Sequence, residues 1–171
     1  MSCYEVALAG LWMKADCLGL IPSAGEDEVE FAMSYGHLHA HTIEEHWGGQ
    51  VAHALCVFIG LLIDLRLGGA RALAESLAYQ ATKSVLSRRF AELLRQDRVR
   101  AYVENYPSSG RFYAGPGKYW TIDFAAKGLG QLVSADRMDI VRKEVRLEDI
   151  ESSYRALSVL FDASQGISQP H

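Results

Sequence analysis

The sequence predicts a mainly α-helical protein with a small β-hairpin, on three observations. Residues 82–95 combine a helix-start residue with a helical spacing of apolar side chains. From Val99 the apolar period changes to two, around turns at 107–110 and 114–117. Residues 134–162 return to a helical pattern, with an apolar stripe of Leu147, Ile150, Tyr154, Leu157 and Phe161.

Helices are also expected before residue 70. Residues 4–20 are apolar and have the pattern of a helix, and a second helix is expected to begin near Val29. The adjacent glycines in 47–50 predict a break, since two glycines destabilise a helix interior by about 2 kcal/mol relative to alanine. Residues 51–69 are apolar almost all round and close on Gly68-Gly69, which predicts a core helix.

The centre of the chain has the pattern of two successive helices. A short helix is expected over 70–79, followed by a turn at Gln80-Ala81 and by Thr82 as the N-cap of the next helix. The buried stripe of that next helix is expected to consist of Leu86, Phe90, Leu93 and Leu94. The opposite side carries Lys83, Ser84, Ser87, Arg88 and Arg95.

This order of elements predicts a winged helix-turn-helix in a single domain over 1–171. Residues 1–50 are expected to hold N-terminal helices for dimerisation and effector binding, and residues 51–128 the DNA-binding winged helix. Residues 129–171 are expected to form a C-terminal dimerisation helix and a tail. Apolar helices at both ends exceed what a winged-helix core covers, which favours a homodimer. The alternative is that both helices pack on their own subunit.

Charge is distributed unevenly along the chain. Residues 64–118 hold ten Lys/Arg against five Asp/Glu, whereas the whole chain has a formal charge of -4. A cationic helix that enters the major groove, followed by a hairpin against the backbone, is a known way to bind duplex DNA. The candidate DNA-binding residues are Thr82, Lys83, Ser84, Ser87, Arg88, Arg95, Ser108, Ser109 and Arg111. The alternative is a solvated helix face.

The stretches 73–99 and 120–132, the latter with a Lys127-Gly128 pair, carry a family resemblance. Over about residues 50–160 the chain resembles MarR-type winged-helix regulators, and PadR-like or other winged-helix regulators remain alternatives. The resemblance implies a homodimer, two recognition helices on a pseudo-palindromic operator and a site for a small-molecule effector. The family's Asp-x-Arg in the wing is absent, and only Arg111 stands near that place.

Five of the six histidines lie between residues 37 and 53, and three interpretations stay open. On one helix face His37, His41 and Glu45 have a spacing that suits a metal ion such as zinc. An effector such as an aromatic carboxylate is the second interpretation, with Trp12, His39, His46, Trp47 and His53 as candidates. In the third interpretation the histidines are structural or face solvent.

Cysteine usage and the remaining motifs set limits on other functions. Cys3, Cys17 and Cys56 are few and widely spaced, which favours thiols in a cytoplasmic protein; Cys3 or Cys17 is a candidate redox sensor and Cys56 is expected to be inert core. No membrane segment, cofactor or catalytic motif is expected. The sequence thus predicts a ligand-released repressor, with a metal-responsive regulator and, less favoured, a metal-dependent enzyme as alternatives.

Overall fold

The structure is a computed structural model that describes residues 31, 34–95, 99–105, 112–127, 133–134, 137–138 and 141–165. Its main helices are α3 (His37–His46), α4 (His53–Leu67), α5 (Arg71–Thr82), α6 (Ser87–Leu94), α7 (Val99–Asn105), α8 (Phe124–Lys127) and α9 (Leu147–Gln165). The strands are β1 (Tyr113–Gly115), β2 (Lys118–Ile122), β3 (Val133–Ser134), β4 (Arg137–Met138) and β5 (Arg142–Arg146). The expectation of a mainly helical protein with a small sheet is confirmed.

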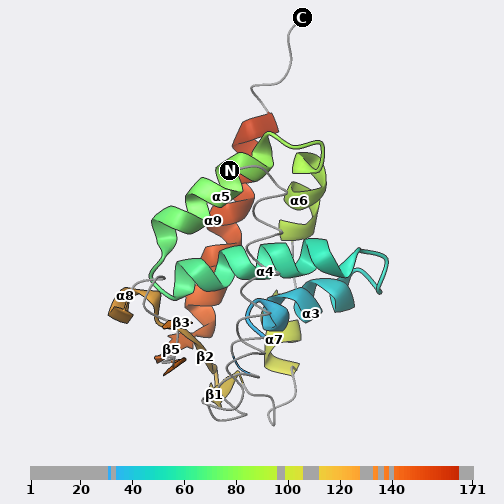
Figure 1. Ribbon diagram of the computed structural model, residues 1–171. Helices are drawn as coiled ribbons and strands as arrows, with labels where there is room; N and C mark the ends of the chain where they lie inside the picture. Colours follow the sequence, from blue (N-terminus) through green and yellow to red (C-terminus); the bar gives the residue numbers. More distant parts are fainter. Residues whose placement is uncertain are drawn as a thin grey trace, which may run out of the picture.

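Helices α4 and α9 organise the core, and both contact most of the other helices (Figure 1). The apolar all-round pattern of α4 explains its central place, because Cys56, Ile59, Leu62 and Ile63 are fully buried. The predicted stripe of α9 is also confirmed: Leu147, Ile150, Tyr154, Leu157 and Phe161 are all buried within this chain. That stripe is therefore part of the core of its own subunit.

Helices α3 and α4 approach each other closely at two glycines. A Cβ added to Gly60 would stand 2.0 Å from the carbonyl oxygen of Gly36, so only glycine fits this crossing. The predicted break between the two helices is confirmed, since Gly48 and Gly49 both have a positive φ in the turn that joins them.

The sheet has the antiparallel order β1-β2-β5. Strands β1 and β2 form a hairpin whose turn is Pro116-Gly117. Strand β5 pairs along all of β2, from Lys118 opposite Arg146 to Ile122 opposite Arg142. The turn lies at the beginning of α9, because the Leu147 backbone N–H donates to the carbonyl of Gly117 over 3.0 Å.

The helix boundaries around Thr82 differ from the prediction. Thr82 is the last residue of α5 and not an N-cap; its Oγ1 donates to the carbonyl of Tyr79 at 2.7 Å. Helix α5 runs through the expected turn at Gln80-Ala81 because Ala74, Ala78 and Ala81 are buried at helical spacing. Helix α6 consequently begins at Ser87, and residues 83–86 form the turn.

Two further predictions were wrong. The expected strand from Val99 is helix α7, because burial of Val99 and Val103 at i, i+4 satisfies a helical spacing. The expected helix over 134–162 begins only at Leu147, since the preceding residues 142–146 pair with β2. Asp149 marks the helix start by accepting a hydrogen bond from the Arg146 N–H at 3.1 Å.

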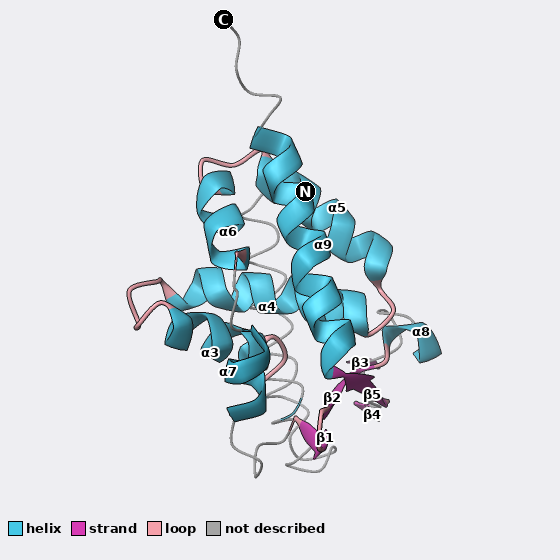
Figure 2. Cartoon of the chain, turned by 180° about the vertical axis from the view of Figure 1, so that it is seen from behind, coloured by secondary structure: helices cyan, strands magenta, loops and turns pink. Residues whose placement is uncertain are grey.

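The hairpin and α6 lie at opposite ends of α9 (Figures 1 and 2). The hairpin turn contacts Leu147, whereas Arg95, directly after α6, pairs with Asp162 near the other end of α9. At 1.5 Å per residue these points are roughly 20 Å apart. The described hairpin and α6 therefore lie at a distance from each other, and the mainly helical fold with its small antiparallel sheet is compatible with a winged helix.

Candidate nucleic-acid interface

The turn between α5 and α6 presents one cation and fixes one serine. Lys83 is exposed, and its Nζ lies 4.3 Å from the ring centroid of Tyr79. The Ser84 hydroxyl donates to the carbonyl of Ala81 at 2.7 Å and accepts from the Leu86 N–H at 3.3 Å. Ser84 therefore stabilises the turn, while Lys83 remains available to an external anion.

Helix α6 has one buried and one cationic side. Its buried residues are Phe90, Ala91, Leu93 and Leu94, and the Phe90 ring packs 5.2 Å from Phe58 and 5.4 Å from Phe161 between centroids. Leu86, expected in the same stripe, is 41% exposed because it precedes the helix. This anchoring fixes which side of α6 faces solvent.

The arginines of α6 differ in how firmly they are held. The side chain of Arg88 is 85% exposed and lies 3.5 Å from Glu92, which also pairs with Arg89 at 3.0 Å. Arg89 is further held by the Trp47 ring, 4.9 Å from its guanidinium carbon. Arg95 pairs with Asp162 at 2.6 Å. Arg88 is thus the arginine of this helix that a ligand reaches most easily, and Ser87 lies one residue before it.

Apolar side chains lie in solvent at the same turn. Val85 is 99% exposed, and Leu86 and Tyr79 are also exposed.

The predicted wing contacts Ser108, Ser109 and Arg111 lie outside the described residues. At the described hairpin, Lys118 pairs with Glu144 at 2.8 Å.

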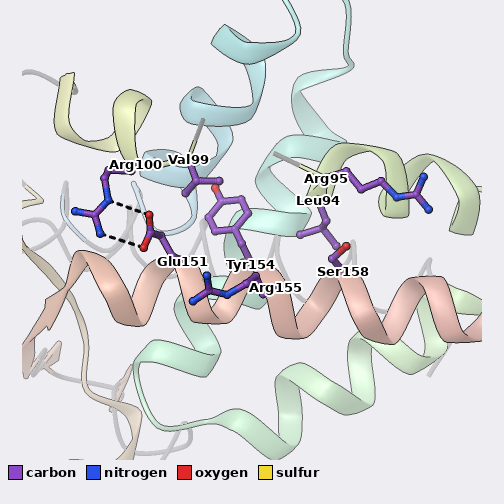
Figure 3. A pocket seen from close by; sticks show the side chains of 8 residues that line it. All are labelled: Leu94, Arg95, Val99, Arg100, Glu151, Tyr154, Arg155 and Ser158. Carbon is purple, nitrogen blue, oxygen red and sulfur yellow. Dashed lines mark hydrogen bonds and ion pairs between the residues drawn. The ribbon is translucent and has the colours of Figure 1, made fainter. Parts of the chain in front are cut away.

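A groove of about 520 Å³ lies between α9 and residues at the end of α6 and the beginning of α7 (Figure 3). Arg100 and Glu151 lie at one end and Arg95 and Ser158 at the other, with Tyr154 between them. The full lining is Leu94, Arg95, Val99, Arg100, Glu151, Tyr154, Arg155 and Ser158. Local sequence patterns do not predict this groove, because its arginines come from segments about 50 residues apart. Its one sequence signal is a cation, Arg155, beside the apolar stripe of a helix whose other charged residues are acidic.

Arg100 and Glu151 form a two-point ion pair in that groove. The Nε and Nη2 atoms of Arg100 each donate to a Glu151 oxygen at 3.1 Å. These hydrogen bonds raise the pKa of Arg100 above its ordinary value. Arg155 is exposed and has no carboxylate partner in the part of the chain that the structure describes, so it is the groove cation best placed to meet an anion.

The predicted effector residues are not brought together. Trp12 lies outside the described residues, and His46 packs edge-on against Trp47 with centroids 5.8 Å apart. His53 lies instead beside His37, and His39 is fully buried in the core. The described members of this set, His39, His46, Trp47 and His53, therefore do not line one pocket together.

His39 belongs to a buried polar network around Asp64. The Asp64 carboxylate accepts from the Gly36 N–H at 2.7 Å and from the Thr121 hydroxyl at 3.2 Å, and His39 Nε2 lies 3.4 Å away. The Tyr154 hydroxyl reaches His39 Nδ1 at 3.5 Å. The His39 ring therefore lies between Asp64 and Tyr154 in the core, with its Nε2 near the carboxylate but without a hydrogen bond to it.

The predicted metal set is brought together only in part. The His37 and His41 rings lie 5.9 Å apart, but Glu45 is exposed, and the carboxylate that contacts His41 is that of Glu44. Among the described residues, no three His, Cys, Asp or Glu side chains converge on a point that holds a metal as they stand. Cys56 is buried, and burial raises the pKa of its thiol to about 11; Cys3 and Cys17 lie outside the described residues.

Comparison with known protein families, curated proteins and solved structures finds no match to this chain. Within the described ranges, the helices are too short or too polar to cross a bilayer.

Proposed function

We propose that this protein is a DNA-binding transcriptional regulator that uses the turn between α5 and α6, together with α6, to contact duplex DNA. The observation that carries the proposal is the exposure of Lys83 and Arg88 on elements whose other side is fixed in the core. In a chain with a formal charge of -4, such a fixed cationic edge favours an anionic partner.

The residue types suit a duplex. A helix of this size is about 12 Å long and fits the major groove. Arg88 has the fork geometry for a guanine edge, Lys83 suits phosphate, and the exposed Val85 offers an apolar contact for a thymine methyl group.

Glu92 is expected to regulate the availability of Arg88. An exposed ion pair at i, i+4 contributes only about 0.3–0.5 kcal/mol, so a phosphate or base displaces it readily. Glu92 also adds a negative charge near the DNA. We therefore expect Glu92→Gln to increase duplex affinity.

We also propose a homodimer, but the residues proposed for its interface differ from those expected from the sequence. The stripe of α9 is buried within the chain, so the proposed interface rests on the apolar residues 4–20, which lie outside the described ranges. Light scattering at micromolar concentration tests this: a dimeric mass supports two α6 helices on a pseudo-palindromic operator, and a monomeric mass refutes it.

The groove between α6, α7 and α9 is the proposed site of a small anionic effector, such as an aromatic carboxylate. Leu94 and Val99 supply apolar surface, and Arg155 and Ser158 supply donors. An effector could compete with Asp162 for Arg95, and it releases DNA only if it binds a DNA-incompetent arrangement of α6 and α9 better than the competent one. Benzoate and related acids are suitable probes, with Arg155→Ala expected to weaken their effect.

Fluorescence anisotropy with random and upstream-region duplexes across a salt series tests DNA binding. Arg88→Ala should weaken binding and lower the slope of log affinity against log salt by about 1 if the contact is to phosphate. Arg71→Ala is the matched control, because Arg71 is also an exposed arginine paired at i, i+4 with a glutamate. Equal behaviour of the two variants, or no binding at low salt, contradicts the proposal.

A metal-responsive regulator is the second candidate function, because three histidine rings of α3 and α4 lie side by side. A metal-dependent enzyme has no comparable support among the described residues.

A further inference from the structure

We propose that His37, His41 and His53 form a binding site for a divalent transition metal at the junction of α3 and α4, with Glu44 as the positioning residue. The three ring centroids form a triangle with sides of 5.9, 5.4 and 6.0 Å. This set differs from the one that helical spacing predicts, because His53 comes from the next helix and Glu45 takes no part.

The size of the triangle is close to that of a three-histidine site. Imidazole nitrogens bind zinc at about 2.0–2.1 Å, so tetrahedral angles place the ring centroids about 5 Å from one another. The observed separations exceed this value by less than about 1 Å. The spacing of the rings thus suits one ion, although the side chains must rotate to point their Nε2 atoms at a common position, because no such group holds a metal as the described residues stand.

The hydrogen bonds of the three rings use the same nitrogen. His37 Nδ1 lies 3.3 Å from the carbonyl oxygen of Tyr35, and His41 Nδ1 lies 3.2 Å from Glu44. His53 Nδ1 contacts the second oxygen of Glu44. Since a carbonyl or carboxylate only accepts, each Nδ1 carries the proton, and each Nε2 keeps the lone pair that a metal needs.

This pattern is the usual outer shell of a histidine metal site. Ligating histidines typically donate their other N–H to a carboxylate or a backbone carbonyl, which fixes the tautomer and makes the ring a better ligand. Here one carboxylate, Glu44, serves two rings from two helices. Each of these ring Nδ1–H groups donates to an oxygen acceptor, and packing does not require these hydrogen bonds, because His41 and His53 are about half exposed.

The rings have room to move. The side chains of His41 and His53 are 47% and 54% exposed, so they turn without displacing the core. The ligands flank the turn at Gly48 and Gly49, and a bound ion would cross-link α3 to the first residue of α4. Imidazole ligands suit zinc, copper and nickel, and a three-nitrogen set leaves a coordination position for water or a further ligand.

The test is metal binding by the tag-free full-length chain, with Zn²⁺ followed by calorimetry and Co²⁺ by its visible absorption. We expect one ion per chain, and at least about tenfold weaker binding in His41→Ala, His53→Ala and Glu44→Gln. Glu45→Gln is the matched control, since it removes the neighbouring exposed carboxylate of the same helix and should bind like the unmodified chain.

Urea unfolding without metal checks that Glu44→Gln does not act through stability, and we expect that curve to be unchanged while the cobalt spectrum is lost. Absence of binding, or equal binding by Glu44→Gln and Glu45→Gln, overturns the proposal. Binding that survives loss of both His41 and His53 assigns the ion to other residues and also overturns it. None of these outcomes depends on whether the protein binds DNA.

Discussion

Asp64 joins several segments that are far apart in the sequence. Its buried carboxylate accepts from Gly36 before α3 and from Thr121 in β2, and through His39 it is connected to Tyr154 in α9. A buried carboxylate is tolerated only when its oxygens are satisfied, and here a backbone N–H and a hydroxyl donate to it while the His39 ring lies beside it. Asp64 thus ties α4 to three other elements.

Replacing Asp64 should cost far more than replacing an exposed aspartate. Asp64→Ala leaves buried donors without an acceptor, and we expect a loss of about 3 kcal/mol in the free energy of unfolding. Asp162→Ala removes only the exposed pair with Arg95 and should cost less than about 1 kcal/mol. Urea denaturation measures the free energy of unfolding of both variants. Similar losses in the two variants would show that the network does not stabilise the core.

Cys56 is expected to be an unreactive thiol. Its side chain is fully buried, and burial raises its pKa to about 11, so very little thiolate exists near neutral pH. In a Cys3→Ser, Cys17→Ser variant we expect no reaction with a thiol reagent at pH 8 until urea is added. Rapid labelling of the folded variant would contradict the burial of this residue.

Among the helices, α9 has a buried side and an exposed side that can be compared at two nearby residues. Leu157 is fully buried, whereas Val159 is 68% exposed on the opposite side of the helix. Leu157→Ala should cost about 2–5 kcal/mol, since it leaves a cavity. Val159→Ala should change the free energy of unfolding by less than about 0.5 kcal/mol. Equal effects in thermal or urea unfolding would mean that α9 is rotated about its axis.

Long periodic elements could be predicted from the sequence, and short ones could not. The core helix around Ile59 and the stripe from Leu147 to Phe161 have enough turns for one period to dominate. Over Val99–Asn105 a period of two and a spacing of four fit equally well, so the pattern alone does not distinguish a strand from the helix that the structure shows. Residues 142–146 become a strand only because β2 offers a pairing edge.

A candidate site, too, could be predicted only where its residues lie within one regular element. Exposure of Arg88 follows from helical periodicity and was predictable, although the helix begins later than Thr82. The partnership of Glu44 with His53 depends on how the turn at Gly48 and Gly49 returns the chain, which no local spacing encodes. The groove at Arg155 likewise requires the tertiary contact of α9 with α6 and α7.

For the whole molecule, burial of tyrosines makes stability sensitive to alkaline pH. The pKa values of Tyr35, Tyr119 and Tyr154 are raised, in each case mainly by desolvation. In the unfolded chain these phenols ionise near pH 10, while the folded chain keeps them protonated. Above pH 10 the unfolded state therefore binds fewer protons, and the free energy of unfolding falls by up to about 1.4 kcal/mol per pH unit for each group.

Urea titrations between pH 8 and 11 check this dependence. Tyr154→Phe should flatten the alkaline fall relative to the unmodified chain, because Tyr154 is fully enclosed and its phenylalanine replacement cannot ionise. Tyr79→Phe is the control, since Tyr79 is 56% exposed and should leave the pH profile unchanged. A Tyr154→Phe profile identical to that of the unmodified chain would be evidence against the burial of its hydroxyl.

The contact between Gly36 and Gly60 has a consequence for how this sequence can change. At Gly36 the backbone needs a φ of +81, and an added Cβ would lie 3.0–3.2 Å from atoms of α4; at Gly60 an added Cβ meets the carbonyl oxygen of Gly36. A substitution at either position cannot be rescued by one at the other, because each glycine is required by the backbone of its partner. In a library of random variants selected for folding, both positions should accept almost no other residue.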